Sequence, residues 1–446
     1  MARPDTQSIL DTLIRGAKAA GADAADALLV ENVAASVSYR LGKLEDIERA
    51  ESQDLGLRVF IGQKVAFVSS TDFSKDALAQ LPGRAVAMAR LAPEDKFAGL
   101  APRERLATAF PDLDIEDASE PSADTLVEWA QTSEAAAMAV KGVTNSEGGG
   151  ASFGRTAIAL ATSDGFAGGY AGTSCGVGVA VVAGEGTGME RDYDHANARH
   201  AHDLASPVEI GRSAGERAVK RLNPRKVKSQ AVPIVYDPRV SSSLVGHFAG
   251  AISGSSIARG VSFLKDSLGK KVFAPQINVI DDPHRRRGLR SKPFDGEGVA
   301  NRRWALIENG VLRTWLLESA SARQLGLQTT GHAARGTGGP PAPSPTNLYM
   351  EAGALTPQAL IADIKQGFYV TELIGMGVNG VTGDYSRGAA GFWIENGEIA
   401  YPVSEITIAG NLKDMFLNLT AADDLDFKHG TNAPTVRIEG LTVAGA

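Results

Sequence analysis

The sequence has few of the residues from which catalytic and metal sites are usually built. Its 446 residues include one cysteine, Cys175, and seven histidines, none of which lies in a His-Glu-x-x-His motif. A single cysteine excludes an intrachain disulfide and is typical of proteins from a reducing compartment. We therefore expect a cytoplasmic protein that is stabilised by its core.

The sequence also lacks the features that direct a protein to a membrane or to nucleic acid. No apolar run approaches the roughly 20 residues that a spanning helix needs, and the first residues have no signal-peptide core. The net charge is −7, so there is no overall basic character to attract a phosphate backbone. One basic stretch, residues 284–290, is short and flanked by acidic residues, which favours a solvated loop. We expect neither a membrane nor a nucleic acid as partner.

The composition is that of an ordinary globular protein, with 43% hydrophobic and 22% charged residues. Helix-like and strand-like patterns alternate through the first half, and strand-like patterns with glycine-rich turns dominate the second. A polar bridge at 223–230 separates them. We predict an α+β fold of two domains: an N-terminal mixed α/β half at 1–225, and a C-terminal β-rich half at 226–446 with an antiparallel sheet and flanking helices.

Two turns and one loop stand out in the second half. Asn309-Gly310 and Asn396-Gly397 each separate two strand-like runs, which is a strong signal for a tight hairpin. Residues 331–347 are too rich in glycine and proline for a helix or a central strand. A loop of this length in a compact domain is usually functional or disordered.

Three motifs are candidates for chemical sites. The cluster His195, His200 and His202 is the best local candidate for a metal, but such a polar run before a helix more often supplies caps and turns. Cys175 lies in a Gly/Ala/Val strand, which favours a small buried side chain over a nucleophile. Residues 375–380 match G-x-G-x-x-G, but further glycines follow, so no helix is expected to open there.

Two Gly-x-Ser-x-Gly strings, at 150–154 and 172–176, lie in strand-like sequence. A nucleophile elbow needs a helix directly after the serine, and neither string has one. From the residues alone, no constellation forms a catalytic site.

Several longer segments resemble one known family. They are residues 56–72, 262–269, 288–298, 345–349, 372–391 and 393–399. Together they resemble the TldD/PmbA family, also described as peptidase U62 and modulator of DNA gyrase, and within it the PmbA (TldE) branch. The resemblance extends over nearly the whole chain.

The resemblance implies a heterodimeric TldD–TldE zinc metalloprotease that degrades unfolded peptides, processes peptide antibiotic precursors and affects an antitoxin. In the TldD branch a His-Glu-x-x-x-His helix and a later cysteine hold the metal. Here the most natural register places Gly246, His247 and Ala251 at the helix positions, and Gly388 near the cysteine position. A register shifted by one leaves only His247 as a possible ligand. We expect no catalytic residue and no metal in this chain, and zinc in a TldD-type partner.

Three functions remain open at this point. The first is a non-catalytic subunit that binds a TldD-type zinc-peptidase partner and helps to hold an unfolded peptide. The second is a regulator that binds DNA gyrase or its antitoxin system. The third is an independent peptidase with an unrecognised site, so whether the chain is itself an enzyme stays undecided.

The predicted contact residues lie in the C-terminal half. We expect residues 331–347 and 378–391 to border a cleft that a partner or an extended peptide enters. The candidate peptide- or partner-binding residues are His247, Arg335, Thr346, Asn347, Tyr385 and Arg387. The alternatives are a packed or capping His247, a Tyr385 and Arg387 that end a strand, and a mobile surface loop at 331–347. Alanine at Arg335, Asn347 or Arg387 is expected to weaken assembly or peptide turnover and leave the melting temperature nearly unchanged.

Overall fold

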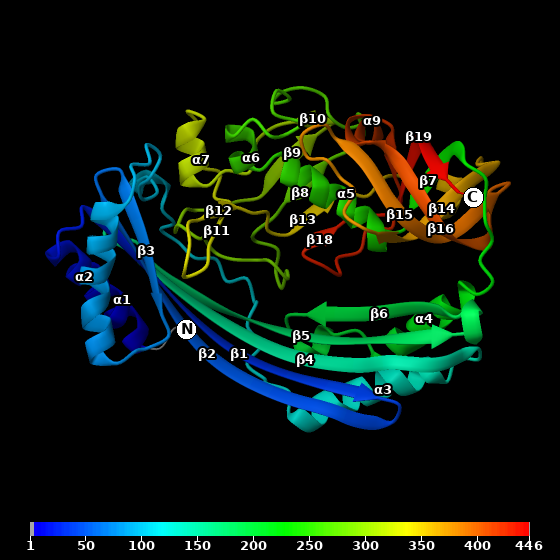
Figure 1. The fold of residues 1–446 in the computed structure, drawn as a ribbon, viewed down its shortest axis with the longest axis horizontal. Coiled ribbons are helices and arrows are strands. Elements are labelled where there is room, and N and C mark those ends of the chain that lie inside the picture. The colour runs from blue at the N-terminus through cyan, green and yellow to red at the C-terminus, as the bar shows by residue number, and fades with distance from the viewer. Residues whose placement is uncertain (1–3, 446) are drawn as a thin grey trace.

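A computed structural model describes residues 4–445, with side chains from Thr6 onward. A long, curved sheet forms the N-terminal part, and the C-terminal part lies across one of its faces (Figure 1). None of the described helices is both long enough and apolar enough to cross a bilayer.

The N-terminal sheet has six strands in the order β3-β2-β1-β4-β5-β6, and every neighbouring pair is antiparallel. The strands are β1 (Ala24–Arg40), β2 (Lys43–Ile61), β3 (Lys64–Ser70), β4 (Val143–Thr162), β5 (Ala167–Ala183) and β6 (Glu190–Ala198). β1, β2, β4 and β5 are far longer than the usual strand of about six residues. They form one continuous surface that supports the rest of the molecule.

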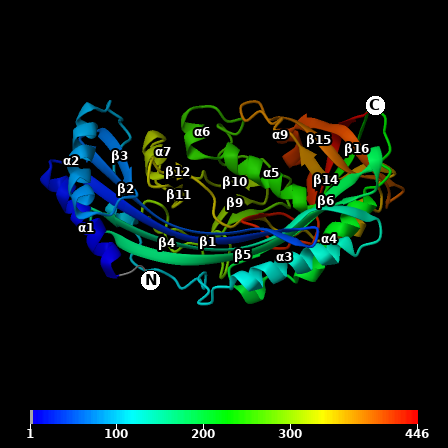
Figure 2. The ribbon, with the colours of Figure 1, turned by 60° about the horizontal axis from the view of Figure 1, so that its bottom comes forward.

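Four helices cover one face of this sheet. They are α1 (Pro4–Ala19), α2 (Lys75–Leu91), α3 (Ala123–Met138) and α4 (Pro207–Lys220). The side chains of β1 show why both faces of the sheet are covered, because successive residues of a strand point to opposite sides. Leu29 packs in the cluster of α1 and α2, and Val37 packs near α3. Leu28 packs instead against Phe294 of the C-terminal domain. Figure 2 shows α3 and α4 on one side of the sheet and the C-terminal domain on the other.

The C-terminal domain is built on two further sheets. One has the order β16-β15-β14-β7-β19-β17, and it curls so that β16 also pairs with β19. Its strands are β7 (Gln230–Tyr236), β14 (Gln366–Ile374), β15 (Asp384–Glu395), β16 (Glu398–Asn411), β17 (Leu419–Ala421) and β19 (Val436–Ala444). The other has the order β10-β9-β8-β13-β18. Its strands are β8 (Val279–Asp281), β9 (Trp304–Glu308), β10 (Val311–Leu312), β13 (Leu348–Met350) and β18 (Thr431–Asn432).

Short helices and one small hairpin complete this domain. The helices are α5 (Pro238–Ala251), α6 (Gly254–Ala258), α7 (Ser319–Gln324), α8 (Pro357–Ile361) and α9 (Leu412–Leu417). The hairpin joins β11 (Ala333–Ala334) to β12 (Ala342–Pro343). One large core of apolar side chains, among them Phe248, Phe273 and Phe416, is shared by α5, α9 and both sheets.

The α+β prediction is confirmed, with one difference in the sheets. The C-terminal strands are not all antiparallel, since β14 runs parallel to β7 and β13 runs parallel to β18. The N-terminal sheet shares no strand with the C-terminal ones, and the chain crosses between them within 221–229. Both Asn-Gly turns form as predicted, with φ of 50° at Asn309 and Asn396.

Candidate functional site: a cleft beside α5

Helix α5 is the element that carries the predicted site, and its start is fixed by the chain itself. Strand β7 ends at Tyr236, and the Asp237 carboxylate then accepts the Arg239 backbone N–H at 3.0 Å, which caps the helix. Pro238 occupies the first turn, where a missing N–H costs no hydrogen bond. Leu244 and Phe248 are buried on the inner side of the helix.

The outer side of α5 is left with small residues and one histidine, and it borders a cleft of about 340 Å³. Gly246, His247 and Gly250 line it from the helix, Met376 and Val378 line it from the β14–β15 connection, and Arg387 lines it from β15. The connection is fixed by its own turn and by a hydrogen bond of 3.0 Å from the backbone N–H of Phe263 to the carbonyl of Gly380. The cleft therefore has a defined shape.

The charged groups of this cleft are basic. Burial, followed by the neighbouring Arg387 guanidinium, holds the pKa of His247 below its ordinary value. Arg387 donates from Nε to the Ile374 carbonyl at 3.3 Å and forms no ion pair with a carboxylate anywhere in residues 4–445. With a neutral imidazole and an unpaired guanidinium, the cleft attracts an anion.

Three polar atoms behind the cleft have no hydrogen-bond partner. They are Nε2 of His247 and the hydroxyls of Tyr236 and Tyr385. The Tyr385 ring meets the His247 ring edge-on, with 6.2 Å between centroids. The two phenols interact with one another strongly enough to affect the pKa of each, although their hydroxyls do not reach the geometry of a full hydrogen bond. Burial and then Tyr385 raise the pKa of Tyr236 well above its ordinary value, and burial raises the pKa of Tyr385, so both stay neutral.

Of the six predicted contact residues, the structure brings together His247 and Arg387 at the cleft, with Tyr385 buried directly behind. It places the other three elsewhere. Arg335, Thr346 and Asn347 lie in the interior, so the expectation that residues 331–347 border the same cleft needs correction. These three side chains are buried and hydrogen-bonded within the protein, away from the cleft.

Arg335 is an interdomain residue. Its Nη1 donates to Oδ1 of Asp26 in β1 at 2.8 Å, and both side chains are 1% exposed. Its segment is not a free loop either, because the β11–β12 hairpin reaches the N-terminal sheet. A Cβ on Gly56 of β2 would lie 2.3 Å from the carbonyl oxygen of Thr337 at the hairpin tip. The hairpin thus connects the two domains.

Thr346 and Asn347 fasten β13 to its surroundings. The Thr346 hydroxyl and backbone N–H both donate to the Asp281 carboxylate at 2.6 Å, and Asp281 also contacts Nε2 of His332 at 3.2 Å. The Asn347 amide donates to the carbonyl of Asp282 at 2.7 Å and accepts the Arg290 backbone N–H at 2.9 Å. All these groups serve to hold the domain together.

A zinc ion of the TldD kind does not fit the residues at this site. Gly246 and Ala251 have no donor atom, and Gly388 has no thiol, so His247 is the single ligand available at the four positions. Zinc sites in proteins use three or four protein ligands. We therefore derive no chemistry through a metal at α5.

The three histidines of the candidate metal cluster do not lie together. His195 lies against His429, with 5.2 Å between ring centroids. His200 and His202 instead lie near Asp117, with ligand atoms within 4.8 Å of one another. They already have partners: His200 Nε2 meets the Asp114 carbonyl at 2.9 Å, and His202 Nε2 meets Arg287 Nη1 at 2.8 Å. We interpret this cluster as a contact between the domains.

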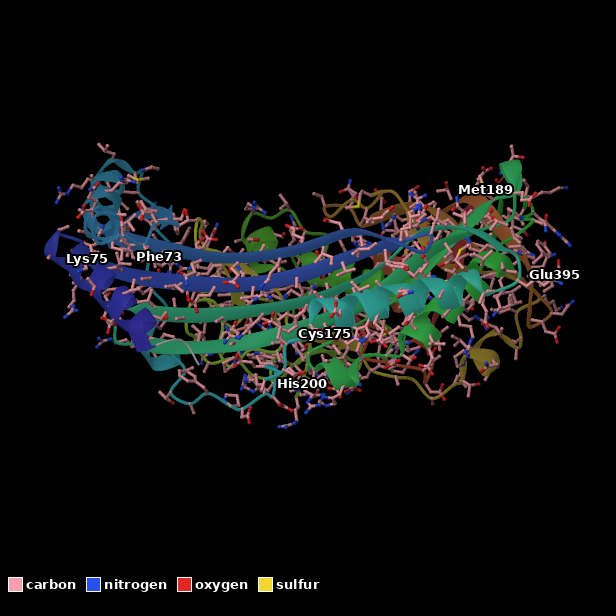
Figure 3. The ribbon with its side chains drawn as sticks, turned by 90° about the horizontal axis from the view of Figure 1, so that it is seen from below. Phe73, Lys75, Cys175, Met189, His200 and Glu395 are labelled. Atoms are coloured by element: carbon pink, nitrogen blue, oxygen red, sulfur yellow. The ribbon has the colours of Figure 1, made fainter. Side chains whose placement is uncertain are left out.

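The remaining motifs carry no chemistry. Cys175 is buried in β5 beneath α3, and burial with nearby Asp117 raises the pKa of its thiol to about 11 (Figure 3). Ser152 and Ser174 lie within β4 and β5, so neither forms a nucleophile elbow. The glycines at 375–380 form a turn between two strands and no helix opens there.

Sequence reasoning missed a buried charge cluster at the domain interface. Asp26 and Arg58 of the sheet meet Arg335 and Glu297 of the C-terminal domain. Nearby, burial and then Glu297 raise the pKa of Asp295 to about 6. Buried carboxylates can mark active sites, but Asp295 accepts three backbone N–H bonds, from Glu297, Val299 and Ala333. Its role is structural.

The fold and the cleft thus define an α+β protein with a basic, partly apolar cleft beside α5. Comparison with known families gives the class a name. Consecutive parts of the chain match domain 1, the central domain and the C-terminal domain of the PmbA/TldA metallopeptidases, over residues 25–89, 116–222 and 229–445. The chain belongs to this family, in its PmbA/TldE branch.

Individual relatives agree with this assignment. Metalloprotease PmbA of Escherichia coli O157:H7 is 40% identical over 425 residues, covering 95% of this chain and 92% of the relative. A putative modulator of DNA gyrase from Bacteroides thetaiotaomicron, solved as a crystal structure, matches 100% of both chains with 26% identity and a TM-score of 0.92. TldE from Thermococcus kodakarensis has the same fold, with a TM-score of 0.85, 21% identity, and coverage of 98% and 99%.

Proposed function

We propose that this chain is the non-catalytic, TldE-type subunit of a heterodimeric TldD–TldE zinc metalloprotease that acts on unfolded peptides and peptide antibiotic precursors. The observation that carries the proposal is the composition of α5. The family places a metal on this helix in its TldD branch, and here His247 is the one residue at those positions that could bind a metal.

The cleft can bind a chain, but it has no means of cutting one. Peptide hydrolysis needs an activated water and a group that accepts its proton. The polar groups at the cleft are an imidazole, a guanidinium and two neutral phenols behind them. None of these is a carboxylate base, and no second metal ligand accompanies His247. A partner that brings zinc and a base would supply the missing chemistry. We expect the complex to act in the cytoplasm.

Mixing experiments test the proposal. The purified chain, a TldD-type protein from the same organism, and the mixture are each incubated with an unstructured peptide. We expect cleavage that is much faster in the mixture than with either protein alone, a complex that elutes earlier than both subunits, and loss of activity with a chelator. Chelator-resistant cleavage by the isolated, homogeneous chain would contradict the proposal and favour an independent peptidase.

A matched pair of variants locates the chemistry. The TldD-type partner with its motif glutamate changed to glutamine should form the complex without cleaving. His247→Ala in this chain should leave the zinc content of the complex unchanged, because His247 holds no metal in this proposal, and it should reduce cleavage only as far as it weakens peptide binding. Loss of the zinc from a His247→Ala complex that still assembles would place the reaction on this chain.

A further inference from the structure

We propose that the cleft beside α5 binds a peptide segment with a carboxylate next to an apolar side chain, and that Arg387 holds this carboxylate. The proposal deepens the proposed function and rests on it in one respect, that the occupant is a peptide. The cleft itself, its charge and its unpartnered groups are properties of this chain alone.

Arg387 differs from three other partly buried arginines of the protein, Arg199, Arg323 and Arg239. Arg199 and Arg323 each donate from all three guanidinium nitrogens to backbone carbonyls. Arg239 pairs with Asp192 at 2.7 Å. Arg387 uses Nε alone, and within residues 4–445 its two terminal nitrogens donate to no acceptor. A guanidinium presents these nitrogens as a fork that fits the two oxygens of a carboxylate.

The glycines of α5 indicate that a backbone approaches the helix closely. Glycine is the least favourable residue in a helix apart from proline. In α4 the fold itself requires it, because a Cβ on Gly211 would lie 2.1 Å from the Ser133 carbonyl oxygen of α3. In α5 a Cβ on Gly246 or Gly250 would meet no atom within 4 Å. Packing within this chain does not explain these two glycines, and they leave room for a peptide main chain to lie on the helix.

The rim of the cleft determines what accompanies the carboxylate. Two lining residues are exposed, Met376 by 93% and Val261 by 43%, and Ile374, whose carbonyl accepts from Arg387, is 59% exposed. Such large apolar side chains gathered at one opening are typical of a binding surface. A peptide whose carboxylate reaches Arg387 would place a neighbouring apolar side chain against them and remove both from water.

His247 is free to join the contact. Its Nε2 has no hydrogen-bond partner, and the Tyr236 and Tyr385 hydroxyls behind it are likewise unpartnered and almost fully buried. Rotating the imidazole toward a ligand therefore breaks no hydrogen bond. Buried polar atoms without partners are rare in folded proteins, and here three of them lie at one place.

The carboxylate could come from a peptide C-terminus or from an Asp or Glu side chain, and peptide titrations separate the two. The intact chain, without any partner protein, is titrated calorimetrically with acetyl-Ala-Ala-Ala-Leu carrying a free carboxylate. Two other probes are the same peptide as its amide and amidated acetyl-Ala-Ala-Glu-Leu. We expect the free acid to bind at least about tenfold more tightly than its amide, since a charge-assisted contact is lost. Tight binding by the glutamate peptide, with no gain for the free acid over its amide, would assign the contact to a side chain and keep the proposal.

Variants tie the binding to the named residues. Arg387→Gln should weaken the free acid by about tenfold and leave its amide unchanged, and Arg387→Lys should restore part of the difference. Gly246→Ala should raise the melting temperature of the free chain by about a degree or more and should weaken its binding to the peptide. Gly211→Ala in α4 is the control, and it should lower the melting temperature.

Two results would overturn the proposal: no preference for a carboxylate in any of the three peptides, or a preference that Arg387→Gln does not change. Unchanged binding in a stabilised Gly246→Ala would remove the part of the proposal that concerns the helix. Because the titrations need no partner, they fail separately from the proposed function. A chain that assembles with a TldD-type protein but ignores the carboxylate would keep the heterodimer and refute this site.

Discussion

Arg335 and Asp26 form a buried ion pair across the domain interface, with Nη1 of the arginine 2.8 Å from Oδ1 of the aspartate. Asp26 also accepts from Nε of Arg58 at 2.9 Å, and Arg58 Nη2 lies 3.8 Å from Oε1 of Glu297. Acidic and basic side chains thus alternate along a row that crosses the domain interface, in the order Glu297, Arg58, Asp26, Arg335. Because all four side chains are buried, each charge depends on its neighbours for compensation.

The first prediction concerns the stability that this pair contributes. Removing one partner of a buried pair leaves an uncompensated charge, which typically costs about 3–5 kcal/mol. Arg335→Ala should therefore lower the free energy of unfolding by about that amount in urea titrations. Arg303→Ala is the control, because its pair with Glu351 is largely exposed and should change stability little. An unchanged midpoint for Arg335→Ala would show that the interface is not as described, and it would restore the expectation drawn from the sequence.

The second prediction concerns acid. Burial alone would raise the pKa of Asp26, but Arg335 and Arg58 outweigh it and hold the pKa below the ordinary 3.8. An aspartate with a lowered folded pKa contributes stability that is fully present above pH 3.8 and is lost as the pH falls through the folded value. Wild type and Asp26→Asn should therefore differ most near neutral pH and converge below about pH 4.

The comparison in acid is best made as a difference between the two proteins. Asp295, with its pKa raised to about 6, has the opposite sign: its contribution to stability falls as the pH rises from 3.8 toward 6. That contribution is common to both proteins and cancels in the difference. A gap between wild type and Asp26→Asn that stays constant from pH 7 to pH 3 would contradict the assignment.

The third prediction uses the unpartnered phenols behind the cleft. A buried hydroxyl without a partner costs free energy, and removing both members of a polar pair is often neutral or stabilising. The double variant Tyr236→Phe, Tyr385→Phe should unfold at the same or a higher urea concentration than wild type. Tyr369→Phe is the control, because the Tyr369 hydroxyl donates to Asp237 Oδ2 at 2.9 Å. We expect it to lose about 1 kcal/mol, and a comparable loss in the double variant would mean that the two phenols are hydrogen-bonded.

Local signals predicted the local parts of the fold. The Asn-Gly turns formed because left-handed φ at Asn309 and Asn396 is decided by those residues and their glycines. The prediction failed at 331–347, which has the composition of a surface loop. Its Arg335 pairs with a residue 309 positions away, and no pattern within the segment indicates that contact.

The candidate site was predictable to the same extent. The family resemblance led to α5 and to β15, and the structure shows His247 and Arg387 lining one cleft. The sequence could not show that Arg387 lacks an acidic partner, because that depends on every carboxylate that the fold brings near. It also could not separate the glycines of α5 from those of α4, since both pairs have helical spacing. Only the packing of Gly211 against Ser133 distinguishes them.

The last prediction is that the purified chain holds no stoichiometric zinc. At α5 a single imidazole is available, and its lowered pKa leaves it neutral without giving it the further ligands that a protein site needs. Elemental analysis after dialysis should find well below one zinc per chain, while a TldD-type protein treated in the same way retains its metal.

The cluster of Asp117, His200 and His202 provides the internal control, because its ligand atoms lie within 4.8 Å of one another. If one tightly bound zinc per chain were found, and if it disappeared in His200→Ala but not in His247→Ala, the metal would belong to the domain contact. Retention in His200→Ala and loss in His247→Ala would instead place it at α5 and would refute the non-catalytic assignment, because the helix would then carry a working metal site.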